Sequence, residues 1–204
     1  MNRRDFILTT STGAIFAAGG AKAEMAKMQM PWDWTNENGL ARFLEVDPNP
    51  LENEFEKYPR CPYCGMMRKM WSHSRHLIVY EDDSVDATCS IHCAGISLSL
   101  NMDRGPKTIY AGDAGADAEI KPLADTAEMT YVINPAKMGT MTRVSKWAYA
   151  DAAKAEAAAA QAEGTRLASF DDALREAFIG MAEDTIGIRK RRAEKRAKAA
   201  AASE

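Results

Sequence analysis

Four cysteines are the residues whose types and spacing best support chemistry in this sequence. They form two pairs, Cys61-x-x-Cys64 and Cys89-x-x-x-Cys93, with 24 residues between the pairs. A Cys-x-x-Cys loop lets two sulfur atoms converge on one point, and residues four apart share one face of a helix. This arrangement predicts a metal site, a disulfide or a redox centre.

Three kinds of site compete at these cysteines. Zinc held by all four thiols would pin the loop to the helix. A disulfide fits an oxidising compartment. Cu(I) fits because soft thiolate and thioether ligands select it. A thioredoxin-like redox motif fits less well, since its Cys-x-x-Cys follows a strand, whereas here the predicted strands come afterwards.

Two methionines favour a copper site over the alternatives. Met66 follows Cys64 by two residues, and Met138 precedes a glycine in a second predicted loop. Most methionines fill cores, and we expect this of Met67, Met70 and Met129. A methionine beside glycine in a loop is better placed to offer its thioether to a metal, so Met66 and Met138 are candidate ligands.

The histidines are His73, His76 and His92. His92 lies between Cys89 and Cys93, which makes it a candidate ligand or a partner of one. His73 and His76 follow the first motif closely enough to reach the same metal. Their polar surroundings favour ordinary surface or hydrogen-bonded roles for both.

The elements that must position these residues are short strands and helices. Residues 59–65 are a predicted loop, and residues 76–100 predict a strand, a turn, a second strand and a helix. Strands are predicted again near 108–111, 129–133, 145–148 and 166–169, with helices at 151–163 and from 169 to about 186. The fold class is therefore α+β.

The ends of the chain differ from its middle. Residues 1–23 begin with a twin arginine, Arg3-Arg4, and finish in Ala21-Lys22-Ala23, which predicts a twin-arginine signal peptide and a periplasmic location. Residues 24–58 predict an irregular arm. Residues 187–204 predict a basic, Ala-rich helical tail with no apolar face.

Composition narrows the function further. The chain has 204 residues, 46% of them hydrophobic, and a formal net charge of −3. The chain before its basic tail is acidic, so it shows no basic patch of the kind that binds nucleic acid. No apolar run after the predicted signal peptide is long enough to span a membrane. No phosphate-binding loop, nucleophile elbow or His-Glu-x-x-His motif occurs, so nothing in the sequence indicates an enzyme.

The segment Cys61-Pro62-Tyr63-Cys64-Gly65-Met66 resembles the signature of the NosL family, copper chaperones of nitrous oxide reductase maturation. The order of predicted elements over about residues 59–183 is similar too. The resemblance implies two related ββα-type halves, which we place at about 59–105 and 106–186. It also implies a Cu(I) site of Cys61, Cys64, Met66 and Met138.

Two features depart from that family pattern. Family members are commonly lipoproteins, and this sequence has no cysteine at the predicted cleavage site. Cys89 and Cys93 lie outside the motif, which leaves a four-cysteine zinc site open. We therefore expect a non-enzymatic periplasmic Cu(I) chaperone that delivers copper by ligand exchange to nitrous oxide reductase or another periplasmic copper protein. The alternatives are a module stapled by zinc or disulfides and a thiol-disulfide oxidoreductase.

Overall fold

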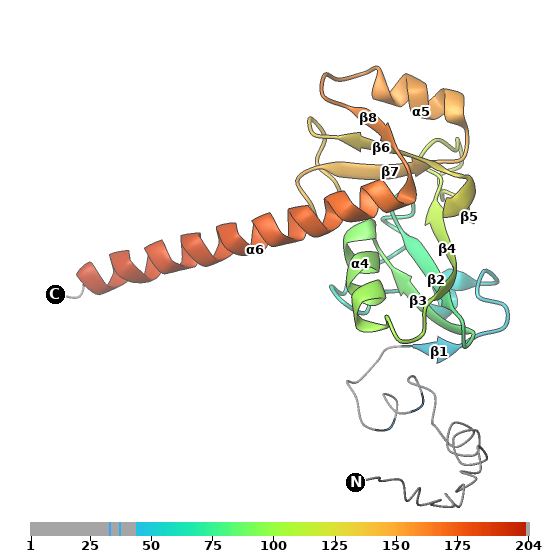
Figure 1. Cartoon of the computed structure of the whole chain (residues 1–204), viewed down its shortest axis with the longest axis horizontal. Coiled ribbons are helices and arrows are strands. Elements are labelled where there is room, and N and C mark those ends of the chain that lie inside the picture. The colour runs from blue at the N-terminus through green and yellow to red at the C-terminus, as the bar shows by residue number, and fades with distance from the viewer. Residues whose placement is uncertain (1–32, 34–36, 38–43, 203–204) are drawn as a thin grey trace, which may run out of the picture. The chain divides into compact units, whose positions relative to one another are not determined.

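The computed structural model describes residues 33, 37 and 44–202. The predicted signal peptide and most of the predicted arm lie outside the described residues. Residues 41–204 form one compact unit that contains both predicted halves. The folded part contains both antiparallel sheets and helices, which confirms the α+β prediction (Figure 1).

The first sheet has five antiparallel strands in the order β1-β3-β2-β4-β5. Its centre is β2 (His76–Tyr80), a run of apolar and aromatic residues that is buried throughout. Asp83, with φ 60°, turns the chain into β3 (Ser84–Thr88). The outer strands are β4 (Pro106–Gly112), β5 (Leu123–Asp125) and the two-residue β1 (Glu45–Val46).

The second sheet has three antiparallel strands in the order β7-β6-β8. They are β6 (Thr130–Asn134), β7 (Ser145–Tyr149) and β8 (Arg166–Ala168). Helix α5 (Ala152–Ala159) connects β7 to β8, and the Asp151 side chain caps its first turn.

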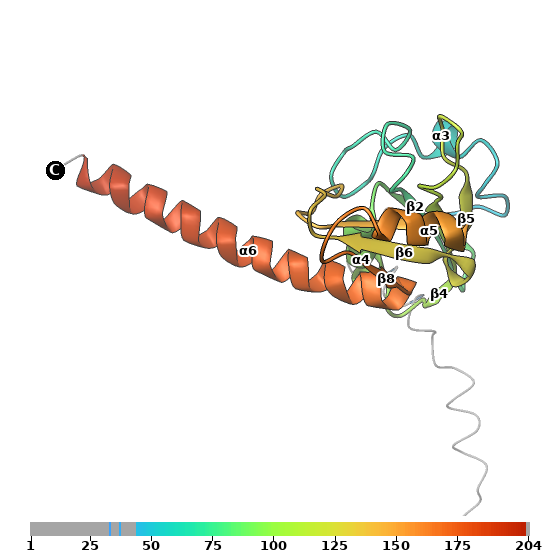
Figure 2. The same ribbon diagram turned by 90° about the horizontal axis from the view of Figure 1, so that it is seen from above.

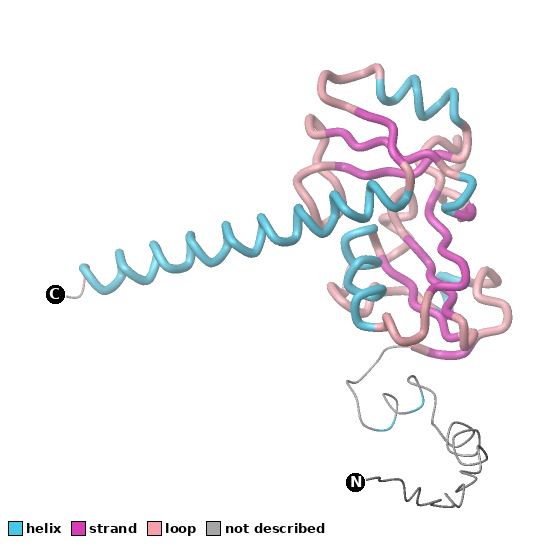
Figure 3. The backbone as a smooth tube through the Cα atoms, viewed as in Figure 1, coloured by secondary structure: helices cyan, strands magenta, loops and turns pink. Residues whose placement is uncertain are grey.

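The two halves repeat one arrangement of strands. In the first, β2 is central, β3 pairs on one side, and β4 pairs on the other after helix α4 (Ile91–Leu100). In the second, β6 is central, β7 pairs on one side, and β8 pairs on the other after α5. This common ββαβ order fits two related halves, and Figure 3 lets the reader follow it. The first sheet includes β4 and β5, so it extends beyond the boundary expected near residue 106.

Helix α6 (Phe170–Ala201) completes the core and then leaves it. Ser169 caps its N-terminus by accepting from the backbone of Asp172, as the sequence indicates. Ala173 and Ala177 are buried in the cluster that includes Tyr131 and Ile133 of β6. Beyond that, Figures 1 and 2 show the helix extending away from both sheets.

Several predicted boundaries differ from the structure. The helix expected to end near 186 runs unbroken into the basic tail, because alanine and long charged residues are all good helix formers. Helix α5 ends before the predicted residue 163, and Gly164 takes up the left-handed turn a few residues later. Sequence reasoning missed β1, β5 and the one-turn helix α3 (Glu54–Lys57), which are too short to show a period. No helix of the described segment is both long and apolar enough to cross a membrane.

Candidate metal centre

The Cys-x-x-Cys loop folds back on itself. The Cys61 N–H donates to the carbonyl of Met66 at 2.9 Å, and the Gly65 N–H donates to the carbonyl of Cys61 at 2.9 Å. Gly65 has φ +76°, a conformation that side chains disfavour, and this allows the reversal. The loop thereby directs Cys61 inward, where it is 1% exposed, and leaves Cys64 half-buried.

Cys89 and Cys93 belong to the junction between β3 and α4. Ser90 is the N-cap of α4, and its hydroxyl accepts from the Cys93 backbone N–H at 3.5 Å. The cap fixes the first turn of the helix directly after the buried strand. Both cysteines are therefore held almost without exposure, at 0% for Cys89 and 1% for Cys93.

The structure brings all four predicted cysteines together. Their sulfur atoms lie within 4.8 Å of one another. The Cys64 and Cys89 sulfurs are 3.4 Å apart, and those of Cys89 and Cys93 are 3.8 Å apart. All four are free thiols. Met66 packs against this cluster and is partly buried there.

One sulfur of the cluster is the preferred site of negative charge. The thiols of Cys89 and Cys93 donate hydrogen bonds to the sulfur of Cys61, and this lowers the pKa of Cys61. The same hydrogen bond to Cys61 is the main cause that raises the pKa of Cys89. A thiolate is the form that binds a metal, so Cys61 is prepared as the first ligand.

Buried Arg68 ties the two cysteine segments together. It is fully buried just after the loop, and its guanidinium donates to the carbonyls of Tyr58 at 2.9 Å and Thr88 at 3.3 Å. Thr88 directly precedes Cys89. Glu54 balances the charge by pairing with Arg68 at 2.7 Å and also with Arg75.

A second buried support involves Asp86 of β3. The Tyr63 hydroxyl, from within the Cys-x-x-Cys loop, donates to this carboxylate, and the Ser97 hydroxyl of α4 donates to it at 2.5 Å. Burial raises the pKa of Asp86. Tyr63 and Ser97 thus fasten the loop to the helix that carries Cys93. Sequence reasoning missed Arg68, Glu54 and Asp86, because charged residues ordinarily indicate surface.

The histidines occupy three different environments. His76 is fully buried in β2, where Nδ1–H donates to the Ser74 carbonyl at 3.0 Å and Nε2 accepts from the Tyr131 hydroxyl at 2.9 Å. Both nitrogens are used, which fits the expected hydrogen-bonded role. The His73 ring meets Trp147 edge-on, with centroids 4.8 Å apart. His92 is half-buried beside the cluster, and burial lowers its pKa.

The loop that carries Met138 reaches the cysteine half through Thr140. The Thr140 and Ser74 hydroxyl oxygens lie 2.7 Å apart, and Ser74 also donates to the Cys89 carbonyl at 2.9 Å. The side chain of Met138 is 79% exposed. The structure therefore brings the predicted loop to the backbone of the cluster, with the Met138 thioether directed to solvent. Met129 is buried in the core, as expected. The same expectation is wrong for Met67 and Met70, which follow the Cys-x-x-Cys loop and are 43% and 72% exposed.

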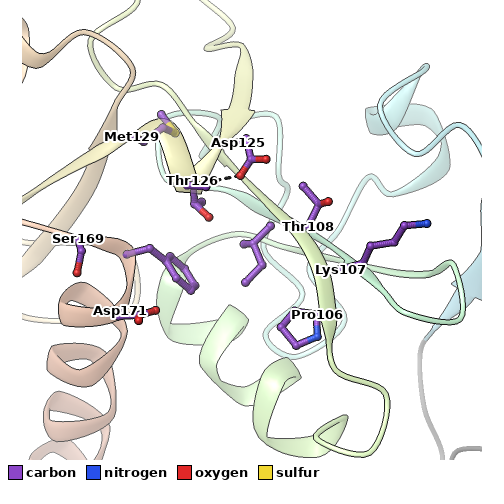
Figure 4. Close-up of a pocket in the computed structure, with 11 residues that line it drawn as sticks. Pro106, Lys107, Thr108, Asp125, Thr126, Met129, Ser169 and Asp171 are labelled. Atoms are coloured by element: carbon purple, nitrogen blue, oxygen red, sulfur yellow. Dashed lines mark hydrogen bonds between the residues drawn. The ribbon is translucent and has the colours of Figure 1, made fainter.

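A pocket of about 410 Å³ lies elsewhere, where the start of α6 faces β4 and the segment after β5. Figure 4 shows Asp125, Thr126, Ser169 and Asp171 around it. Its side chains offer oxygen ligands and include no cysteine or histidine. It is therefore a separate feature with different chemistry from that of the thiol cluster.

The thiol cluster fits a soft or borderline metal. Zinc–sulfur bonds of about 2.3 Å in a tetrahedron place the sulfur atoms about 3.8 Å apart. The 3.4 and 3.8 Å separations are close to that spacing. Cu(I) is served equally well by thiolates with a thioether beside them, and Met66 supplies one. The donor set is therefore suited to either metal.

The geometry defines a small α+β protein built of two ββαβ halves, with a cluster of four thiols in the first that could hold a metal ion. The model of the NosL family matches residues 52–178, which is more than half of the chain, and the chain belongs to this family. A similar solved structure is the crystal structure of the copper chaperone NosL from Shewanella denitrificans. It is 19% identical, with 65% of this chain and 93% of that chain covered and a TM-score of 0.42. No curated protein matches the chain at a significant level.

Proposed function

We propose that this protein is a Cu(I) chaperone that receives copper and delivers it by ligand exchange. The observation that carries the proposal is a cluster of four free thiols within 4.8 Å, reinforced by the thioether of Met66. Membership of the NosL family supports copper as the cargo.

The difference in burial among the four cysteines suits delivery by exchange. Cys61, Cys89 and Cys93 are buried, whereas Cys64 is half-buried at the edge of the cluster. An acceptor thiolate or thioether approaches copper from this edge, forms a bond, and displaces the ligands one at a time. No redox turnover is needed for that transfer.

Met138 and His92 complete the proposed ligand set. Met138 lies in a loop that is already fastened to the cysteine half through Thr140. A rotation of its exposed side chain onto the copper would clamp the two halves over the ion. His92, half-buried between two of the cysteines, serves as a ligand or supports one.

The acceptor that we propose is nitrous oxide reductase or another periplasmic copper protein. The proposal rests on the resemblance of the Cys61–Met66 motif to the NosL signature and on the twin-arginine start of the sequence. Both partners of the exchange would then lie in the same compartment.

A zinc site is the second candidate, because the sulfur spacing also fits a tetrahedral ion. Purification from the periplasm under anaerobic conditions, followed by metal analysis, separates the candidates. Copper near one equivalent supports the chaperone, and zinc near one equivalent supports a structural staple. Reactive thiols without metal support a thiol-disulfide oxidoreductase.

A competition titration against a Cu(I) chelator gives the decisive measurement. Cys61→Ser and Cys64→Ser should each lower Cu(I) affinity by more than tenfold. Met102→Leu is the control, since Met102 is 80% exposed and is not a member of the thiol cluster. Full affinity in both cysteine variants would exclude the chaperone function.

A further inference from the structure

The centre contains more thiols than one Cu(I) ion requires. Four thiols and one thioether surround a single site. Soft thiolate and thioether ligands select Cu(I), and two thiolates with one thioether already form such a donor set. Two of the four thiols can therefore be oxidised while the other two and the thioether keep one ion bound, and a thiol pair in contact is a two-electron reductant.

The geometry identifies which pair of thiols is best placed to be oxidised to a disulfide. The Cys64 and Cys89 sulfurs are 3.4 Å apart, closer than the 3.8 Å between the sulfurs of Cys89 and Cys93. A disulfide bond of about 2.05 Å requires these atoms to approach by about 1.4 Å. Cys64 is also the one thiol of the four that is not buried, so an ion arriving from solvent meets Cys64 first, and the buried Cys89 sulfur lies next to it.

The remaining pair is suited to retaining the product. Cys61 and Cys93 are each 1% exposed, and their sulfur atoms lie within 4.8 Å of each other. Met66 packs against the same cluster. Two buried thiolates and a thioether form a soft, water-poor site that favours Cu(I) over Cu(II).

We propose that the Cys64 and Cys89 thiols reduce Cu(II) to the Cu(I) that the chaperone carries. This activity rests on the proposed function. Two S–H bonds break and one S–S bond forms. Each of two Cu(II) ions gains one electron, and the two protons of Cys64 and Cys89 pass to solvent. In this oxidised form one Cu(I) remains on Cys61, Cys93 and Met66, without the Cys64 ligand of the fully reduced protein, and the Cys93 thiol gives up its proton as it binds the ion. The second Cu(I) is released to an acceptor.

The experiment uses the fully reduced protein and Cu(II) sulfate under anaerobic conditions. The paramagnetic resonance signal of Cu(II) reports its consumption, a Cu(I) chelator reports the product, and thiols are counted in denaturant. We expect two Cu(I) ions formed and two thiols lost for each protein, with peptide mapping that places the disulfide between Cys64 and Cys89.

Variants test the pair directly. Cys64→Ser and Cys89→Ser should each slow Cu(II) consumption at least tenfold, and Met102→Leu should react like the wild type. Persistence of the Cu(II) signal in the wild-type protein overturns the proposal. A disulfide mapped to another pair of cysteines overturns it too, and this readout needs no variant to fold.

A parallel titration with Cu(I) keeps this proposal separate from the chaperone function. Tight Cu(I) binding without Cu(II) reduction would overturn only the reductase activity. Reduction of two Cu(II) ions without retention of any Cu(I) would support the activity and overturn the chaperone function.

Discussion

The Oγ atoms of Ser74 and Thr140 lie 2.7 Å apart, and this hydrogen bond joins the cysteine half to the loop of Met138. Ser74 passes the connection on by donating to the Cys89 carbonyl at 2.9 Å. Two residues separated by 66 positions therefore link the backbone of a candidate ligand to the candidate clamp.

Thr140→Val should loosen this link. Thr140 is buried, and the loss of its hydrogen bond costs about 1 kcal/mol of the free energy of unfolding. If the loop closes on copper, the variant should also release Cu(I) faster to a chelator. Stopped-flow transfer kinetics measure the release. Thr140→Ser retains the hydroxyl and should behave like the wild type, so equal release rates for all three proteins would contradict the role of this contact.

Met138→Leu tests the clamp itself. Leucine has nearly the same volume, so packing changes little, while the thioether ligand is lost. We expect Cu(I) affinity to fall about tenfold, or about 1.4 kcal/mol. Competition titration measures this loss, with Met102→Leu as the matched control because both methionines are about four-fifths exposed (79% and 80%). If only Met66→Leu weakens binding, the site lies within the first half alone.

Arg68→Ala should be among the most destabilising substitutions near the site. The change leaves the Glu54 carboxylate without one of its two buried partners and frees the carbonyls of Tyr58 and Thr88. Removing one member of a buried ion pair costs about 3–5 kcal/mol. Urea denaturation of the metal-free protein measures the cost. Arg60→Ala is the control, since Arg60 is exposed and should change stability by about 0.5 kcal/mol or less.

Acid should destabilise the protein through His76. Burial lowers the pKa of His76 from its usual 6.5 to about 4. Between pH 4 and pH 6.5, His76 is therefore protonated in the unfolded chain but neutral in the folded chain. This contribution to stability is fully present above pH 6.5 and is lost as the pH falls toward 4, by an amount on the order of 3 kcal/mol. Thermal melting of metal-free protein between pH 7 and 4.5 measures it, and a slope that His76→Gln leaves unchanged would exclude His76 as its source.

Export depends on residues outside the described part of the chain. Replacing Arg3 and Arg4 together by lysine should leave the precursor in the cytoplasm, because the twin-arginine route recognises the paired guanidinium groups. Cell fractionation detects the change. Normal periplasmic accumulation of the double variant would refute this route.

The cysteine cluster was predictable because its signal is local. The spacing of Cys61 and Cys64, and of Cys89 and Cys93, already implies convergence. The β-branched and aromatic content of residues 76–81 and the turn at Asp82-Asp83 predict the strands that bring the pairs together. The supports were not predictable in the same way. Arg68 and Asp86 are buried because partners 14 and 11 residues away, Glu54 and Ser97, complete their hydrogen bonds, and no motif in the sequence marks these pairs.

The position of Met138 shows a different limit. Its place in a loop beside glycine is visible in the sequence, but the contact that carries the loop to Ser74 depends on how the two sheets pack. The continuous α6 marks a third limit. Its first turns pack on β6, and its later turns are exposed, so intrinsic helix propensity alone supports them.

The close spacing of the cluster along the chain gives the centre an order of assembly. All four thiols and the supports at Glu54, Arg68, Asp86 and Ser97 lie within residues 54–97. On the ribosome this segment emerges before the second half, and its contacts are more local than those with the second half. We therefore expect the thiols to gather before the contact with Thr140 forms. During folding, the cluster of thiols therefore stays exposed to solvent on the side of Ser74. The contact with Thr140 covers that side when the second sheet folds.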